Sequence, residues 1–196
     1  LFLAWLTAYL FSYAALQLLR TKHRAYRLPS AVYAGLLVPL AVWLLAAMPE
    51  LVFWFLPYLP LLWINGYYAG RNRERELVND FAAVLQFSLM VWIAFQVGGG
   101  TDHAKAAVYF ALSVFYFVGT VFYVKSVIRE KHNPLYYRLS VGYHLLAGVA
   151  AAFLLPPGML PAAAVLLVRA ALVPRSKLAV KQIGILEIAC SVLVGG

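Results

Sequence analysis

The sequence is poor in charged residues, and above all in acidic ones. Charged residues make up only 12% of its 196 residues, and seven acidic residues stand against 16 lysines and arginines. Soluble domains are roughly one quarter charged and about half apolar. Here 64% of the residues are hydrophobic, and the mean hydropathy is +0.82. This composition excludes an ordinary soluble domain and predicts a protein embedded in a membrane.

Residues for familiar covalent, metal and nucleotide chemistry are also scarce. The single cysteine, Cys190, excludes an intramolecular disulfide. The sequence contains no P-loop, GxGxxG, CxxC or HExxH motif, and its only aspartates are Asp80 and Asp102. Three of the four histidines lie between the apolar runs, which argues against a histidine cluster. We therefore expect no metal site and no cofactor.

What the sequence does contain is long apolar runs, each close to the roughly 20 residues that a spanning helix needs. Eight such runs occur, at residues 1–19, 31–48, 51–69, 80–97, 106–128, 139–155, 159–173 and 183–194. They predict an all-α fold, a polytopic transmembrane bundle of about eight helices forming a single domain, 1–196. The chain begins inside one apolar run and ends close behind another, so we expect it to be truncated at both ends.

The basic residues predict the orientation of these helices. Alternate connections hold 13 of the 16: Arg20, Lys22, Arg24, Arg27, Arg71, Arg73, Arg75, Arg129, Lys131, Arg138, Arg175, Lys177 and Lys181. The intervening connections, 48–50, 98–105 and 156–158, hold only Lys105. Because basic loops stay on the cytoplasmic side, the first set is predicted to be cytoplasmic in a bacterial inner membrane. The net charge of +9 is then explained by topology, and nucleic acid is not expected as a partner.

Ionisable and amide side chains near the ends of the apolar runs are the candidate site residues. All lie toward the predicted cytoplasmic side, so we expect a polar cavity open to that side. An embedded ionisable group is costly and is a functional candidate by default. The candidates for proton or polar chemistry are Glu187, His144 and Asp80; those for anion binding are Arg71, Arg75, Lys125 and Arg129; those for polar lining are Asn65, Asn79 and Gln86.

Structural roles compete with these functional ones. Lys125 and Arg169 can extend to the headgroups, and Glu187 can form an internal ion pair with either of them. Asn79 or Asp80 can cap the fourth helix. Tyrosines at 109, 116 and 123 share a helix face, which favours ordinary packing or an aromatic wall for a ligand.

Four stretches of the sequence, 70–84, 116–130, 140–144 and 181–187, resemble the YwiC-like family of bacterial inner-membrane proteins. The resemblance extends over nearly the whole chain. Members of that family usually begin with a further helix bearing a His-Gly-Ala-Trp motif, which is absent here. The resemblance therefore implies nine helices in the complete protein, with a cytoplasmic N-terminus.

The predicted architecture also resembles the UbiA-type intramembrane prenyltransferases. Those enzymes hold a prenyl diphosphate through Mg²⁺ on two aspartate-rich motifs, and neither motif is present here. A paired-metal site needs several carboxylate oxygens. A diphosphate would therefore have to be held by Lys125, Arg129 and the arginines of residues 71–75.

Three functions are compatible with these features. The first, which we favour, is binding of an isoprenoid or other anionic membrane lipid, with or without enzymatic activity. The second is transport, which only Gln96 and the proline-containing helices favour. The third is a scaffold whose basic loops bind a protein partner that the sequence does not identify.

Overall fold

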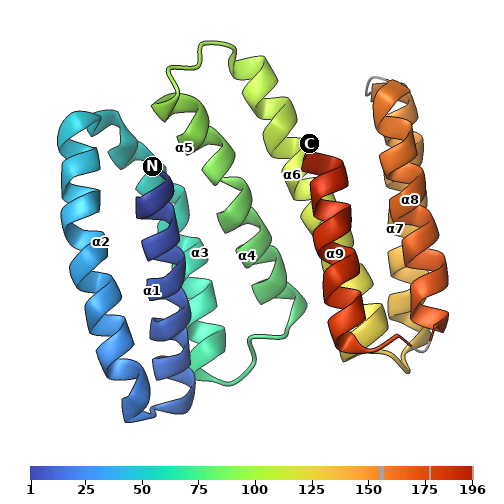
Figure 1. Ribbon diagram of the computed structural model, residues 1–196, viewed down its shortest axis with the longest axis horizontal. Coiled ribbons are helices and arrows are strands. Elements are labelled where there is room, and N and C mark those ends of the chain that lie inside the picture. Colours follow the sequence, from blue (N-terminus) through green and yellow to red (C-terminus); the bar gives the residue numbers. More distant parts are fainter. Residues whose placement is uncertain (155–156, 177, 196) are drawn as a thin grey trace. The chain divides into compact units, whose positions relative to one another are not determined.

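A computed structural model describes residues 1–154, 157–176 and 178–195 of the protein. The described residues are helical throughout, apart from short connections, and contain no strand (Figure 1). The described residues do not include Leu155 and Pro156, where a predicted run meets a predicted connection. They also do not include the basic residue Lys177. The helices are α1 (Phe2–Thr21), α2 (Arg27–Ala47), α3 (Val52–Gly70), α4 (Leu77–Ser88), α5 (Met90–Val97), α6 (His103–Val124), α7 (Pro134–Leu154), α8 (Leu160–Leu172) and α9 (Val180–Gly195).

The eight predicted runs correspond to these helices, because α4 and α5 divide one run between them. Only Leu89 separates the two, although no glycine or proline marks the break. Conversely, Pro39 lies inside α2, and Pro57 and Pro60 lie inside α3, without ending either helix. The prediction of an all-α fold with eight helices is thus confirmed for the described residues.

Several helices begin before the apolar run that predicted them. α2 begins at Arg27, α7 at Pro134 and α9 at Val180. In each case the first turn contains polar or basic residues that hydropathy alone assigns to a connection. Proline suits the start of α7, because its missing N–H is unpaired at that position in any case.

Five stretches are long and apolar enough to cross a membrane: Phe2–Thr21, Arg24–Ala47, Leu77–Val97, His103–Arg129 and Pro157–Arg175. Large apolar side chains on the helices are exposed, as with Phe153 at 84% and Leu28 at 73%. In a membrane such side chains face lipid, where exposure carries no cost. The protein is therefore a helical membrane protein, and passage of all eight segments through the bilayer remains a prediction.

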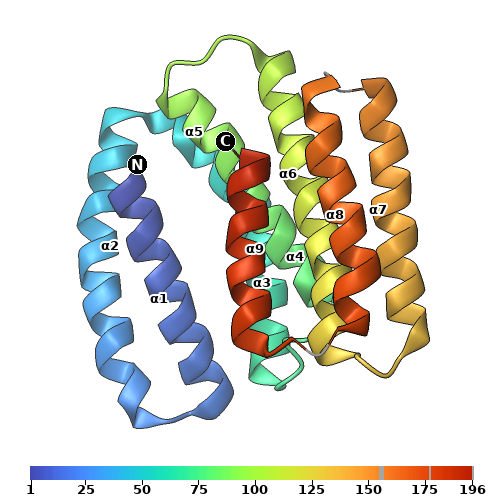
Figure 2. The ribbon, with the colours of Figure 1, turned by 45° about the vertical axis from the view of Figure 1, so that its right-hand side comes forward.

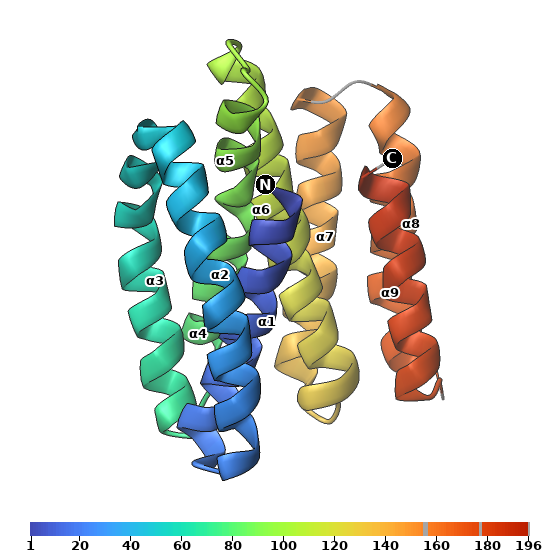
Figure 3. The same ribbon diagram turned by 60° about the vertical axis from the view of Figure 1, so that its left-hand side comes forward.

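The helices form two compact units, Leu1–Val114 and Phe115–Gly196. In the first unit α1 packs against α2 and α3, and α3 packs against α4 (Figure 3). The hydroxyls of Ser88 and Ser113, 3.1 Å apart, join α4 to the first part of α6.

In the second unit α7 packs along α8 (Figure 2), and α9 contacts α8. The core of this unit is formed by Tyr123, Val127, Ala170 and Ile183. The boundary between the two units falls within the sequence of α6, His103–Val124.

Candidate functional site

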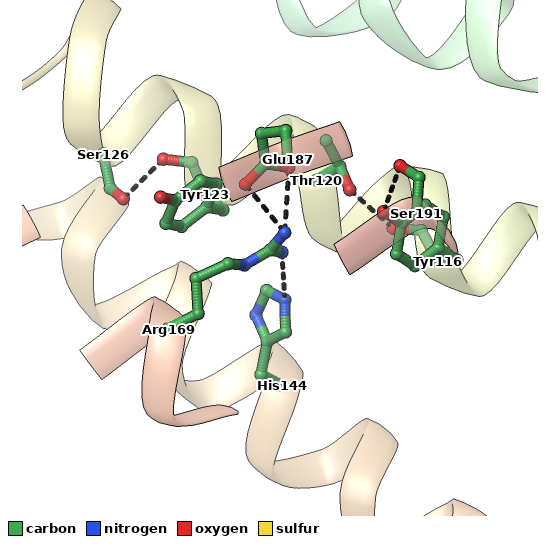
Figure 4. Close-up of polar contacts among 8 residues, drawn as sticks. All are labelled: Tyr116, Thr120, Tyr123, Ser126, His144, Arg169, Glu187 and Ser191. Carbon is green, nitrogen blue, oxygen red and sulfur yellow. Dashed lines mark hydrogen bonds and ion pairs between the residues drawn. The ribbon is translucent and has the colours of Figure 1, made fainter. Parts of the chain in front are cut away.

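A partly buried ion pair joins α8 to α9 in the second unit (Figure 4). Nη1 of Arg169 lies 2.8 Å from both carboxylate oxygens of Glu187. Arg169 is only 4% exposed, and the side chain of Glu187 is 18% exposed. Of the two cations proposed as partners for Glu187, the structure selects Arg169, and that residue does not extend to the headgroups.

His144 of α7 lies on the other side of the same guanidinium (Figure 4). Its Nδ1 is 2.7 Å from the carbonyl oxygen of Ser140, which can only accept, so Nδ1 carries the proton. Nε2 is then an acceptor and faces Nη2 of Arg169 at 3.4 Å. The hydrogen bonds thus select one neutral tautomer of His144 and orient its lone pair toward the arginine.

An aromatic ring completes the surroundings of Arg169. Tyr123 of α6 is fully buried, and the guanidinium carbon lies 4.2 Å from the centroid of its ring. A cation in this position is attracted to the ring face. Arg169 thus contacts a carboxylate, an imidazole and a phenol ring, from three different helices.

This arrangement places two of the predicted catalytic candidates, His144 and Glu187, within one cluster. Both are bonded to Arg169, so the geometry fits the structural alternative of an internal ion pair. Two polar groups of the cluster, Nε of Arg169 and the hydroxyl of Tyr123, are buried without a hydrogen-bond partner among the described residues. A role for His144 and Glu187 in proton chemistry stays a prediction.

The tyrosines that share a face of α6 have different surroundings. Tyr109 is 52% exposed, and the ammonium of Lys105 lies 5.9 Å from the centroid of its ring. The hydroxyl of Tyr116 instead forms a hydrogen bond of 2.8 Å with the hydroxyl of Ser191. Tyr123 is buried beneath Arg169. Of the two interpretations, ordinary packing suits these contacts better than a continuous aromatic wall.

Helix α6 ends in a π-helical turn, Lys125–Arg129. Its defining contact is the backbone N–H of Glu130, which donates to the carbonyl of Lys125 at 2.6 Å. Lys125 is only 3% exposed, with its ammonium 5.8 Å from the ring centroid of Tyr136. The lysine is therefore buried, although its position near the helix end had suggested an extended side chain. Such turns are rare and often occur at functional sites.

Directly after this turn, the connection to α7 forms a hollow of about 440 Å³. Its lining is Arg129, Glu130, Lys131, His132, Asn133 and Pro134. The predicted anion-binding residue Arg129 is thus joined by a second cation, Lys131, and by His132. Sequence reasoning placed Lys131 in a basic connection but did not assign it to a site.

In the first unit, the connection between α3 and α4 folds back onto α1. Nη1 of Arg20 lies 2.6 Å from a carboxylate oxygen of Glu74. Partial burial would raise the pKa of the Glu74 carboxyl, but a backbone hydrogen bond and the Arg20 guanidinium outweigh this effect and lower it. Asn79 donates from Nδ2 to the backbone carbonyl of Glu74 at 2.8 Å and so holds the connection in place.

This arrangement forms a second, partly open cavity of about 160 Å³, whose lining comes from α1, α3, the connection and α4. The lining residues are Tyr13, Leu16, Gln17, Arg20, Asn65, Ala69, Glu74 and Asn79. Two of the three predicted polar lining residues, Asn65 and Asn79, are among them. The third, Gln86, accepts a hydrogen bond from Nδ2 of Asn65 at 2.7 Å.

The expected helix cap is not formed. Helix α4 begins at Leu77, so the N-cap position belongs to Glu76, which makes no side-chain capping bond. Asp80 consequently lies within the first turn, and Asn79 bonds to the connection instead. The prediction that Asn79 or Asp80 caps this helix was wrong, because the helix starts about one turn earlier than the apolar run.

Two of the four predicted anion-binding residues belong to each unit. Arg71 and Arg75 lie in the connection 71–76 of the first unit, where Arg71 stacks on Tyr67 with 4.2 Å from guanidinium carbon to ring centroid. Lys125 and Arg129 belong to the second unit. Gln96, which favoured transport, accepts a hydrogen bond from the indole N–H of Trp54.

Comparison with known proteins identifies the family. The family model described as "YwiC-like protein" matches residues 1–95. An "Uncharacterized protein" of Haemophilus influenzae is 32% identical over 194 residues, which cover 96% of this chain and 80% of that protein. The chain belongs to the YwiC-like family.

A further relative bears the family name itself. "Uncharacterized protein YwiC" of Bacillus subtilis is 38% identical over 149 residues, 74% of this chain and 62% of that protein. No solved structure matches the YwiC-like chain. The resemblance to UbiA-type prenyltransferases accordingly remains a prediction, whereas the YwiC-like resemblance is confirmed.

Proposed function

We propose that this YwiC-like protein binds the headgroup of an anionic membrane lipid at the basic ends of its helices. The observation that carries the proposal is the hollow lined by Arg129, Lys131 and His132, in the connection that follows the π-helical turn of the buried Lys125. Two cations beside one carboxylate, Glu130, leave an excess of positive charge. Phosphate and carboxylate groups suit such a site.

The location of the hollow supports the same proposal. It follows the end of a stretch long and apolar enough to span the membrane, His103–Arg129. A lipid headgroup lies at this depth, and each lysine or arginine near an anionic surface contributes about 1 kcal/mol to binding. In our proposal these basic ends face the cytoplasm across a bacterial inner membrane.

The positive charges of the hollow favour an anionic headgroup. A diphosphate on an isoprenoid and the phosphate of a diacyl lipid present the same anionic oxygens. Among the described residues no group of three or more His, Cys, Asp or Glu side chains could hold a metal ion. In the proposal the cations of the chain itself bind the headgroup, and no transfer reaction is proposed.

The test is native mass spectrometry of the purified protein after exchange into zwitterionic lipid. We add phosphatidic acid or an isoprenyl diphosphate and compare the wild type with Arg129→Gln/Lys131→Gln. About 1 kcal/mol per cation corresponds to about fivefold weaker binding for each substitution. Lys105→Gln, at the opposite end of the predicted topology, is the matched control and should bind like the wild type.

Two results would overturn the proposal. One is retention of anionic lipid no greater than that of the zwitterionic lipid. The other is equal loss of binding in Lys105→Gln and in the double variant, which would indicate a general effect of net charge. A preference for isoprenyl diphosphate over phosphatidic acid would extend the proposal toward the isoprenoid ligand.

A further inference from the structure

The C-terminal end of α3 carries two stacked aromatic rings and a cation, all exposed. The indole of Trp63 stacks on the ring of Tyr67, with 5.5 Å between the ring centroids and 28° between the planes. The guanidinium carbon of Arg71 lies 4.2 Å from the centroid of the same tyrosine, and its Nη1 donates a hydrogen bond to the phenol oxygen. Trp63 is 69% exposed and Tyr67 is 39% exposed. We call these three side chains the α3 column.

The α3 column lies on the side of its helix that faces away from the neighbouring helices of the first unit. Its members follow one another at intervals of four residues, which places them on one face. Asn65 and Ala69, on the opposite side, are buried. There α3 packs against α1 and α4, and Asn65 donates a hydrogen bond to Gln86 of α4. Within this unit the α3 column is therefore open to an occupant from outside the chain.

The charge of Arg71 is not neutralised by an acidic residue. The two glutamates of the connection to α4 are paired with other arginines, Glu74 with Arg20 and Glu76 with Arg73. Among the described residues, the contacts of the Arg71 guanidinium are those with Tyr67, a neutral phenol. An arginine that is held in place in this way retains its charge and its remaining N–H donors for a phosphate group.

The neighbouring apolar residues indicate what kind of anion fits. Toward the middle of α3 the same face continues with Leu59 and Leu56, which are both exposed. Indole rings are favoured where hydrocarbon meets the headgroups, and the N–H of Trp63 can donate to an ester carbonyl. From the helix end inward, the face thus presents a cation, an N–H donor and alkyl groups. Phosphate, ester and acyl chain follow in the same order along a phospholipid.

The α3 column also distinguishes anionic from zwitterionic lipids. The guanidinium of Arg71 already lies over the ring of Tyr67, where an ammonium group would otherwise be attracted. The same guanidinium repels the ammonium group of phosphatidylcholine or phosphatidylethanolamine. A phosphate without an ammonium group, as in phosphatidylglycerol, is attracted without that repulsion.

We propose that the α3 column binds the phosphate and the upper acyl chains of one anionic phospholipid. Arg71 contacts the phosphate, and the rings of Tyr67 and Trp63 pack against the lipid below it. The site belongs to the first unit and shares no residue with the hollow of residues 129–134. Either site can therefore fail while the other stands.

Fluorine NMR of the protein labelled with 5-fluorotryptophan, in phosphatidylcholine nanodiscs, tests this site directly. The resonance of Trp63 is assigned with Trp63→Phe, and the other four of the five tryptophans serve as controls in the same sample. As phosphatidylglycerol replaces phosphatidylcholine, the Trp63 resonance should shift saturably. It should need about fivefold less phosphatidylglycerol than phosphatidylethanolamine, the factor expected for one cation near an anionic headgroup.

Substitution identifies the cation. Arg71→Gln should weaken the response of the Trp63 resonance to phosphatidylglycerol about fivefold. Arg24→Gln is the matched control, because it removes the same charge from the basic connection between α1 and α2. This variant should respond like the wild type.

Three outcomes overturn the proposal: a Trp63 resonance that phosphatidylglycerol does not shift; equal responses to phosphatidylglycerol and phosphatidylethanolamine; or an unchanged response in Arg71→Gln. The lipid comparison uses the unsubstituted chain, so it remains decisive even where a substitution prevents folding. The Trp63 resonance reports on the α3 column, whereas the mass spectrometry of Arg129→Gln/Lys131→Gln reports on the hollow. Loss of the first response alone would overturn this inference and leave the proposed function intact.

Discussion

Arg169 illustrates how a single side chain can constrain three helices at once. Its guanidinium contacts Glu187, His144 and Tyr123, which belong to α9, α7 and α6. Taking an arginine and a glutamate out of water is costly, and only a close pair with further hydrogen bonds offsets that cost. Removal of one partner of the pair should therefore destabilise the protein more than replacement of both.

The first prediction concerns this pair. Arg169→Met leaves the partly buried Glu187 carboxylate, 18% exposed, without its partner, and loss of one partner of a buried pair costs up to about 3–5 kcal/mol. The double variant Arg169→Met/Glu187→Met removes both charges and should recover most of that stability. Unfolding in detergent, followed by circular dichroism, measures both. A double variant no more stable than the single one would contradict the buried-pair interpretation.

A second prediction concerns Glu74 and pH. Because the pKa of its carboxyl is lowered in the folded protein, its contribution to stability is fully present above the unfolded pKa. That contribution is lost as the pH falls through the folded pKa. The difference in unfolding free energy between the wild type and Glu74→Gln should therefore shrink on acidification.

The matched control for this pH series is Glu76→Gln. It removes the same charge from the same connection, but its partner is Arg73 and not Arg20. A difference between wild type and Glu74→Gln that stays constant from neutral to acidic pH would show that the carboxylate does not provide the stabilisation.

At the scale of helices, small residues decide how closely two elements approach. Gly119 of α6 faces α7: a Cβ added there would lie 3.1 Å from Cε1 of Tyr143 and 3.2 Å from Nε2 of His144. Neither ring is free to move away. The hydroxyl of Tyr143 donates to the carbonyl of Phe115 at 2.9 Å, and His144 is bonded to Ser140 and Arg169.

The third prediction follows from this approach. Gly119→Ala should destabilise the protein by about 1–3 kcal/mol, the usual cost of overpacking. Gly142 of α7 has open space at the corresponding position, so Gly142→Ala should be neutral or stabilise by up to about 1 kcal/mol through helix propensity. Thermal unfolding of the two variants in the same detergent makes the comparison. Equal effects would refute a close approach at Gly119.

For the whole molecule, the prediction concerns orientation in the membrane. The basic connections are expected in the cytoplasm and residues 98–105 outside. In a Cys190→Ser background, an impermeant maleimide added to intact cells should label Thr101→Cys. It should label Asn72→Cys and His132→Cys only after the membrane is opened. Labelling of all three in intact cells would rule out the proposed topology.

The sequence by itself determined the class of protein and the eight apolar segments in which its helices lie. Both follow from local properties: apolar runs about as long as the bilayer is thick predict helices, and basic connections predict orientation. The break at Leu89 escaped prediction because no local residue type causes it. The early starts of α2, α7 and α9 escaped because hydropathy does not register polar first turns.

Only the tertiary structure decided which polar groups meet. The sequence marked Glu187, His144 and Lys125 as costly to embed but left their partners open. The partner of Glu187 lies 18 residues away, and that of Arg20 lies 54 residues away. Such pairs depend on how helices pack and on how far a connection folds back. For the same reason the sequence marked Asn65 and Asn79 as lining residues, whereas the contribution of Gln17 to the same lining became visible only with α1 in place.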